Sequence, residues 1–185
     1  MDPRVKRTRK LLQQAFLELL QEKEFSSISV QDITERATIN RATFYAHFTD
    51  KYMLLDITLR QLFQDAITSK LPASAQGDKY NLRQVIGIVL GFLNEFYSRC
   101  DPDNLYKVER IVQEEVEVIL LRWLKQTAIT DPGVRRETIA TAMSWAICGT
   151  AIKWCLDKKG LSHSEMVQHI LQVLMEMGTY VRNLA

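Results

Sequence analysis

The sequence predicts an all-α protein, and three observations support this class. Helix-breaking residues are scarce, with seven glycines and four prolines in 185 residues. Apolar residues recur at the three- and four-residue spacing of helix faces rather than at alternate positions. Cap residues stand where several of these segments begin, as Ser29, Asn40, Asp50 and Ser162 do.

The length and charge set broad limits. A chain of 185 residues suits one long domain or two small ones, and 46% hydrophobic with 25% charged residues is typical of a soluble globular protein. The net charge of +2 does not by itself indicate a nucleic-acid partner. Residues 1–51 hold nine Lys/Arg against seven Asp/Glu, whereas residues 52–185 hold fifteen of each, so the excess is N-terminal. Its densest part could lie near phosphates, although a solvated helix end explains it as well; it comprises Arg4, Lys6, Arg7, Arg9 and Lys10.

Neither targeting nor disulfide chemistry is indicated. The basic N-terminus is not followed by an uninterrupted apolar run, so we expect no signal peptide. The most apolar stretch, 139–156, includes Lys153 and is expected to be a buried helix of a soluble protein. Three cysteines form no even framework, which favours a reducing, cytoplasmic location.

The helical pattern divides the chain into two parts. We expect an N-terminal three-helix domain over 1–50, a connecting helix over 51–70 and a C-terminal helical-bundle domain over 72–185. Residues 71–79, with proline, serine and glycine, are the clearest linker. The expected helices, one of which (101–125) can contain a break, cover 3–24, two short segments within 29–48, 51–70, 80–99, 101–125, 135–158 and 162–181, with a turn at 131–133.

Residues 29–51 predict two short helices joined by a tight turn. Ser29 and Asp32 form a near capping box for the first helix, and Asn40 is placed to accept a hydrogen bond from the Thr43 backbone N–H of the second. Phe44 and Phe48 are four residues apart, so they share the face that packs on the core.

The opposite face of the second helix predicts a close approach to another surface. Ala42 and Ala46 occupy its middle, Arg41 and Tyr45 one edge, and Thr43 and His47 the other. A helix that is small in the middle and rimmed by hydrogen-bonding groups fits the major groove of B-DNA, with phosphates on both sides.

This stretch resembles the DNA-binding domain of the TetR (tetracycline-repressor-like) family of bacterial regulators. The resemblance rests on Val30, Ile33, Ala37, Thr43-Phe44-Tyr45, His47-Phe48, Asp50-Lys51 and Leu54-Leu55. It implies a homodimer that places one recognition helix per subunit in successive major grooves of a palindromic operator, with half-sites about 34–36 Å apart. The resemblance also implies that residues 1–50 are the DNA-binding domain and that residues 72–185 are the effector-binding and dimerisation domain. Outside residues 29–55 the chain fits the family only in length and helical pattern.

Residue roles follow from the resemblance by position. Thr43, Tyr45 and Lys51 would bind backbone phosphates, and Arg41 would read a base edge. Gln31 would contact a base or a phosphate, and His47 would contact DNA with the half of its ring that we expect not to pack against the core. The chain has Thr38 where the family often has glycine, and because a β-branched residue disfavours positive φ, we expect Thr38 to hold negative φ or the turn to be remodelled.

The last two expected helices predict the partner. Apolar residues cover most of the circumference of helix 135–158, so one side needs cover from outside its own domain. A second copy, bound through helices 135–158 and 162–181, is the economical choice. The alternative is a central helix in a monomeric bundle.

Aromatic and sulfur side chains gather after residue 80. In the family such residues often line an effector pocket, although each one alone is explained as ordinary core. The gathering includes Tyr97 and Trp154, and the six residues that we expect to line a pocket for an unknown small molecule are Phe92, Phe96, Tyr106, Trp123, Met143 and Trp145. Glu109, Glu114, Glu115 and Glu117 suit a cationic effector or a solvated helix face.

We expect no enzyme, no cofactor and no metal. The sequence has no Gly-rich phosphate loop or nucleophile motif, and His163 and His169 lack the spacing of metal ligands. The resulting prediction is a dimeric transcriptional regulator, a repressor released from its operator by a small molecule. The alternative is a similar dimer that acts through a protein partner without binding an operator.

Overall fold

The computed structural model describes residues 2–98, 102–126, 135–157 and 160–183. Within these ranges the chain is α-helical and contains no strand, which confirms the predicted class. The helices are α1 (Pro3–Glu22), α2 (Val30–Ala37), α3 (Arg41–Tyr45), α4 (Lys51–Lys70), α5 (Lys79–Tyr97), α6 (Pro102–Gln126), α7 (Arg136–Leu156) and α8 (His163–Asn183), with a 3₁₀ turn, η1 (Phe25–Ser27), between α1 and α2.

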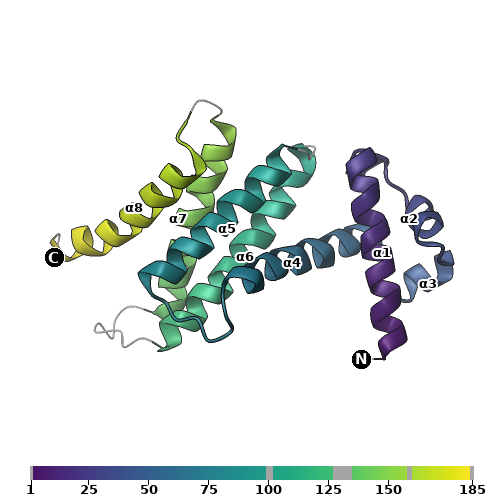
Figure 1. Cartoon of the computed structure of the whole chain (residues 1–185), viewed down its shortest axis with the longest axis horizontal. Helices are drawn as coiled ribbons and strands as arrows, with labels where there is room; N and C mark the ends of the chain where they lie inside the picture. The colour runs from purple at the N-terminus through teal and green to yellow at the C-terminus, as the bar shows by residue number, and fades with distance from the viewer. Residues whose placement is uncertain (1, 99–101, 127–134, 158–159, 184–185) are drawn as a thin grey trace.

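The helices form two groups joined by α4. Figure 1 shows α1, α2 and α3 together at one end of the molecule and α5 to α8 packed as a bundle at the other, with α4 running between them. Within the bundle α6 packs on α7, and α5 packs on both α7 and α8. Helices α2 and α3 therefore lie at the opposite end of the molecule from α7 and α8 (Figure 1).

Several predicted boundaries shift. The first helix ends at Glu22 rather than 24, because Lys23 is extended (φ −153°). Helix α6 has no break, and α7 ends at Leu156 rather than 158. The predicted turn at 131–133 lies outside the described residues.

The core of the N-terminal group is built from the predicted apolar stripes. Phe44 and Phe48 are fully buried, as their four-residue spacing predicts, and they pack with buried side chains of α1 such as Leu12 and Phe16. Ring edges meet ring faces here, for example between Phe16 and Phe25 at 6.0 Å. This apolar packing holds α3 with one face inward.

A cluster of charged groups joins α4 to the bundle. The guanidinium of Arg60 binds Asp56 on its own helix at 2.9 Å, and Glu114 and Glu115 on α6. Three carboxylates converge on one half-buried guanidinium, and their hydrogen bonds raise the pKa of Arg60 although burial opposes this. Arg110 adds bonds to Asp56 and Glu114. The acidic side of α6 therefore binds α4, in part, rather than standing free in solvent.

Candidate nucleic-acid interface

Side-chain caps fix where the two short helices begin. The Ser29 hydroxyl accepts from the Asp32 backbone N–H at 3.1 Å, and the Asp32 carboxylate accepts from the Ser29 N–H at 2.7 Å, so the predicted capping box is complete. These bonds, with Lys23 at 2.9 Å, lower the pKa of Asp32 to about 2. The Asn40 side chain caps α3, but it accepts from the Ala42 N–H at 2.8 Å rather than from Thr43. The cap is thus one residue tighter than predicted.

The turn between the helices corrects a prediction. Thr38 has φ 55° and ψ 44°, in the left-handed region, so the expected negative φ is wrong. The Thr38 N–H donates to Glu35 O at 3.1 Å and the Ile39 N–H donates to Thr34 O at 2.9 Å, which is the Schellman pattern. These two bonds offset a cost of about 1–2 kcal/mol for a non-glycine residue in this region. The turn therefore keeps the geometry that glycine would otherwise provide.

The outer face of α3 matches the predicted arrangement. Ala42 and Ala46 are exposed in its middle. Arg41 and Tyr45 lie side by side along one edge: an Arg41 nitrogen is 3.3 Å from the Tyr45 hydroxyl, and the guanidinium carbon is 5.7 Å from the ring centre. Tyr45 is 48% exposed. A flat, accessible surface with one cation on its edge results.

The other predicted contacts are more enclosed or already bonded. Thr43 and His47, on the second edge, are half-buried. Gln31 is exposed at the start of α2, where its amide donates to Glu35 at 2.8 Å. Both edges of α3 and the start of α2 thus belong to the same pair of consecutive helices.

Lys51 has a different role in this structure from the phosphate contact expected for it. Its ammonium donates to three backbone carbonyls around η1, those of Phe25 at 3.0 Å, Ser26 at 3.1 Å and Ile28 at 2.7 Å. Three bonds use all the donors of an ammonium group. Burial, with the nearby positive charge of Lys107, lowers the pKa of Lys51. Lys51 therefore ties the start of α4 to the turn before α2.

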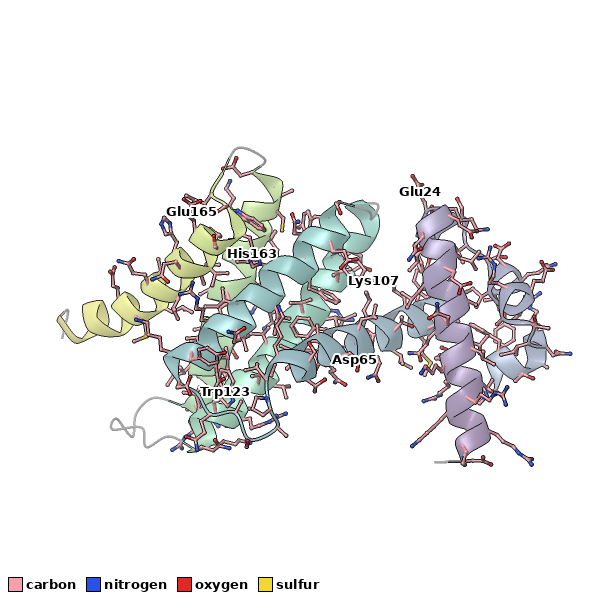
Figure 2. The ribbon with its side chains drawn as sticks, viewed as in Figure 1. Glu24, Asp65, Lys107, Trp123, His163 and Glu165 are labelled. Atoms are coloured by element: carbon pink, nitrogen blue, oxygen red, sulfur yellow. The ribbon has the colours of Figure 1, made fainter. Side chains whose placement is uncertain are left out.

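Two cations make contacts with this unit that the sequence did not predict. Arg9 on α1 donates to the His47 carbonyl at 3.5 Å, and its guanidinium carbon is 5.6 Å from the centre of the Phe48 ring. Lys107, at the start of α6, places its ammonium 3.8 Å from the centre of the Tyr52 ring on α4. In Figure 2 Lys107 lies on the side of the bundle that faces the N-terminal helices. Both contacts depend on tertiary packing, which no local pattern reveals.

None of the six residues expected to line an effector pocket lines either of two cavities formed by the described residues. Phe92 and Phe96 pack together, with Phe92 against Phe63 of α4. Trp123 is buried at the other end of the bundle, against Gly77 (Figure 2). The other three differ in exposure: Met143 is half-buried, whereas Tyr106 and Trp145 are each 58% exposed.

A cavity of about 500 Å³ lies elsewhere, where the ends of α5 and α7 meet the segment before α8. Tyr97 and Cys155 are among its lining residues, and the Tyr97 hydroxyl donates to Glu109. The full lining comprises Asn94, Tyr97, Ser98, Trp154, Cys155, Asp157, Gly160 and Leu161. Burial raises the pKa of the Cys155 thiol to about 11, so this thiol stays protonated at neutral pH.

Known proteins share both the N-terminal unit and the whole fold. Residues 12–56 match the model of the family described as bacterial regulatory proteins, tetR family. An uncharacterised HTH-type transcriptional regulator of Bacillus subtilis, YxbF, is 36% identical over 178 residues, which is 94% of this chain and 46% of that protein. The HTH-type dhaKLM operon transcriptional activator DhaS of Lactococcus lactis is 30% identical over 95 residues, covering 50% of this chain and 48% of that protein.

A solved structure extends the likeness to the bundle. A tetR-family transcriptional regulator from Streptomyces coelicolor superposes with a TM-score of 0.60 at 20% identity, covering 95% of this chain and 89% of the other. At that identity the likeness concerns the fold. Residues 12–56, with the helix-turn-helix unit, therefore belong to the tetR family of bacterial regulatory proteins. The chain spans about half the length of the curated relatives that it matches.

Proposed function

We propose that the chain is a cytoplasmic transcriptional regulator that binds operator DNA through the outer face of α3. The observation that carries this proposal is the geometry of α3, whose Phe44 and Phe48 are fully buried while Ala42 and Ala46 face solvent. In this assignment Arg41 reads a base edge and Tyr45 binds a phosphate. The remaining assigned contacts are Gln31, Thr43 and His47.

This assignment calls for a dimer, because one five-residue helix offers few contacts to DNA. Helix α7 buries Ile147 and Ala151 inward, but its opposite side exposes Ala142, Gly149 and the Trp145 ring. By length and composition alone α7 could also cross a membrane, and 28% of its apolar window is buried. We assign the outer side of α7, together with exposed Val173 and Met175 on α8, to a second copy of the chain.

Release by a small molecule would act through α4. This helix is tied to α6 at two points, by Arg60 with Glu114 and Glu115, and by Tyr52 with Lys107. A ligand that moves α6 would therefore move α4 and change the separation of the two α3 helices. Because an operator fixes that separation, a small change weakens binding. We propose the cavity beside Tyr97 as a candidate effector site.

We further propose that the chain represses, because loss of operator spacing alone then suffices for control. A reporter gene behind the chain's operator would be expressed at a lower level when the chain is present. Higher expression in the presence of the chain would contradict repression and indicate activation, the role that the name of DhaS gives for that protein.

The test of DNA binding compares two variants on one duplex, selected from a random-sequence pool by the unaltered chain. Arg41→Ala is expected to reduce discrimination against a substituted half-site by about 1–3 kcal/mol, because an arginine can read guanine bidentately. Tyr45→Ala is expected to weaken binding to all duplexes alike. Uniform weakening by Arg41→Ala would reassign Arg41 to the backbone, and binding unaffected by both changes would contradict the proposed interface.

A further inference from the structure

Several cations of the N-terminal unit already bind other groups of the protein. Residues 1–51 hold nine lysines and arginines. Lys23 pairs with Asp32 at 2.9 Å, Arg36 pairs with Glu22 at 2.7 Å, and Lys51 donates to three carbonyls. Arg9 likewise lies on the His47 carbonyl, so Arg41 and the four exposed cations of α1 remain available. Affinity for DNA depends mainly on cations that neutralise phosphates, so α1 holds most of the charge that can serve this purpose.

The first part of α1 carries five cations and no acidic side chain. No acidic residue occurs between Pro3 and Leu17. Arg4, Lys6, Arg7 and Lys10 are exposed, and within the described residues none of their side chains has an ion-pair partner. Such a row of like charges repels itself, and a polyanion would relieve this repulsion.

Arg9 shows which side of α1 faces the recognition helix. Its guanidinium lies on the His47 carbonyl and the Phe48 ring, at the C-terminal end of α3, and its Nε is buried without a hydrogen-bond partner. Figure 1 shows α3 beside the N-terminal half of α1. At about 100° per residue, Lys6 and Lys10 lie roughly 60° and 100° around α1 from Arg9, whereas Arg4 and Arg7 lie farther round, at roughly 140° and 160°.

The edge of α3 that ends beside Arg9 has no cation of its own. Arg41 charges the first edge, but the second carries only Thr43 and His47. DNA seated on α3 presents phosphates along both edges. The phosphates beyond the second edge would therefore meet the side of α1 that Arg9 marks.

We infer that Lys6, Arg9 and Lys10 form a second phosphate-binding row, which holds the DNA backbone on the side of α3 opposite Arg41. Arg9 fixes α1 against α3, and the two lysines neutralise phosphates. This inference rests on the proposed DNA binding and supplies the charge that Lys51, bound to carbonyls, does not.

The test measures how the affinity of the full-length chain for its selected duplex depends on salt concentration. Each phosphate contact contributes about 0.9 to the slope of log K against log salt. Lys6→Gln/Lys10→Gln is expected to reduce that slope by about 1.8 per subunit and to weaken binding to random duplex equally. Arg4→Gln/Arg7→Gln removes the same charge from the other side of α1 and is expected to reduce the slope by less than half as much.

Thermal unfolding of both double variants is expected to match the unaltered chain, since all four side chains are exposed. An unchanged slope for Lys6→Gln/Lys10→Gln, or equal reductions for the two pairs, would overturn the assignment to this row while leaving binding through α3 intact. If the unaltered chain binds no duplex from the pool, both the row and the proposed function fail.

Discussion

Lys51 is the residue on which the position of the helix-turn-helix unit most depends. Its ammonium donates to carbonyls of residues 23 to 26 positions earlier in the chain, so it closes the loop formed by η1, α2 and α3. Its distance of 4.6 Å from the centre of the Phe25 ring adds a cation–π contact. A substitution of Lys51 is therefore expected to disturb the packing that positions α3, whether or not Lys51 contacts DNA.

Lys51→Met is therefore expected to lower stability by about 1–3 kcal/mol, because charge-assisted hydrogen bonds to three carbonyls are lost. Thermal unfolding would measure this as a fall in the transition temperature. Lys70→Met, at the exposed end of the same helix, serves as the control and should change stability by less than about 1 kcal/mol. Unchanged stability of Lys51→Met with a reduced salt slope of DNA binding would restore the phosphate role instead.

Thr38 holds a conformation that its side chain opposes. Thr38→Gly is expected to stabilise the chain by about 1 kcal/mol, because relief of left-handed strain exceeds the added entropy of glycine in the unfolded state. For a chain of this size that corresponds to a rise of about 2–4 °C in the unfolding temperature. Thr38→Ala keeps a Cβ and should recover less than Thr38→Gly. A lower transition temperature for Thr38→Gly would mean that the threonine side chain stabilises the turn.

At the scale of single elements, α2 has a pH-dependent start. The pKa of Asp32 falls from 3.8 to about 2 on folding, so its contribution is fully present above about pH 4 and is lost as the pH falls through 2. The unfolding temperatures of the unaltered chain and Asp32→Asn are expected to differ most above pH 4 and to converge near pH 2. A difference that stays constant down to pH 2 would show that the capping box does not stabilise the carboxylate.

Local patterns predict the elements well because caps and apolar stripes act within one turn of helix. Ser29 with Asp32, Ser162 with Glu165, and the buried pair Phe44 and Phe48 all stand as the sequence indicates. The predicted partner of the Asn40 cap is wrong by one residue, Ala42 rather than Thr43, because a capping side chain can accept from either the second or the third N–H of a helix.

Tertiary placement explains the features that local patterns do not predict. Thr38 adopts positive φ because two backbone bonds close the turn, which a propensity for negative φ does not foresee. Lys51 finds carbonyls that are distant in sequence. Trp145 faces solvent while Trp123 is buried, although both stand in apolar helical stretches. Which face of a helix meets which neighbour is a property of the packed bundle.

At the scale of the whole molecule, the exposed side of α7 is the feature that a second copy would explain. Trp145→Glu is expected to convert a dimer to a monomer, because it places a charge in the apolar centre of the proposed interface. Sedimentation velocity would report the change as a fall from twice the chain mass to the chain mass. Tyr80→Glu alters an aromatic side chain that is 69% exposed at the start of α5, and it should leave the mass unchanged. A dimer that survives Trp145→Glu would place the interface elsewhere.

The central claim is that two α3 helices read two half-sites together, and selection of duplexes from a random-sequence pool tests it most directly. The account predicts that the unaltered chain enriches an inverted repeat whose half-site centres lie about one helical turn, roughly 34–36 Å, apart. It also predicts that Arg41→Ala enriches a repeat of the same spacing with at least one base position relaxed. Enrichment of no sequence, or of single half-sites without a fixed spacing, would contradict the account.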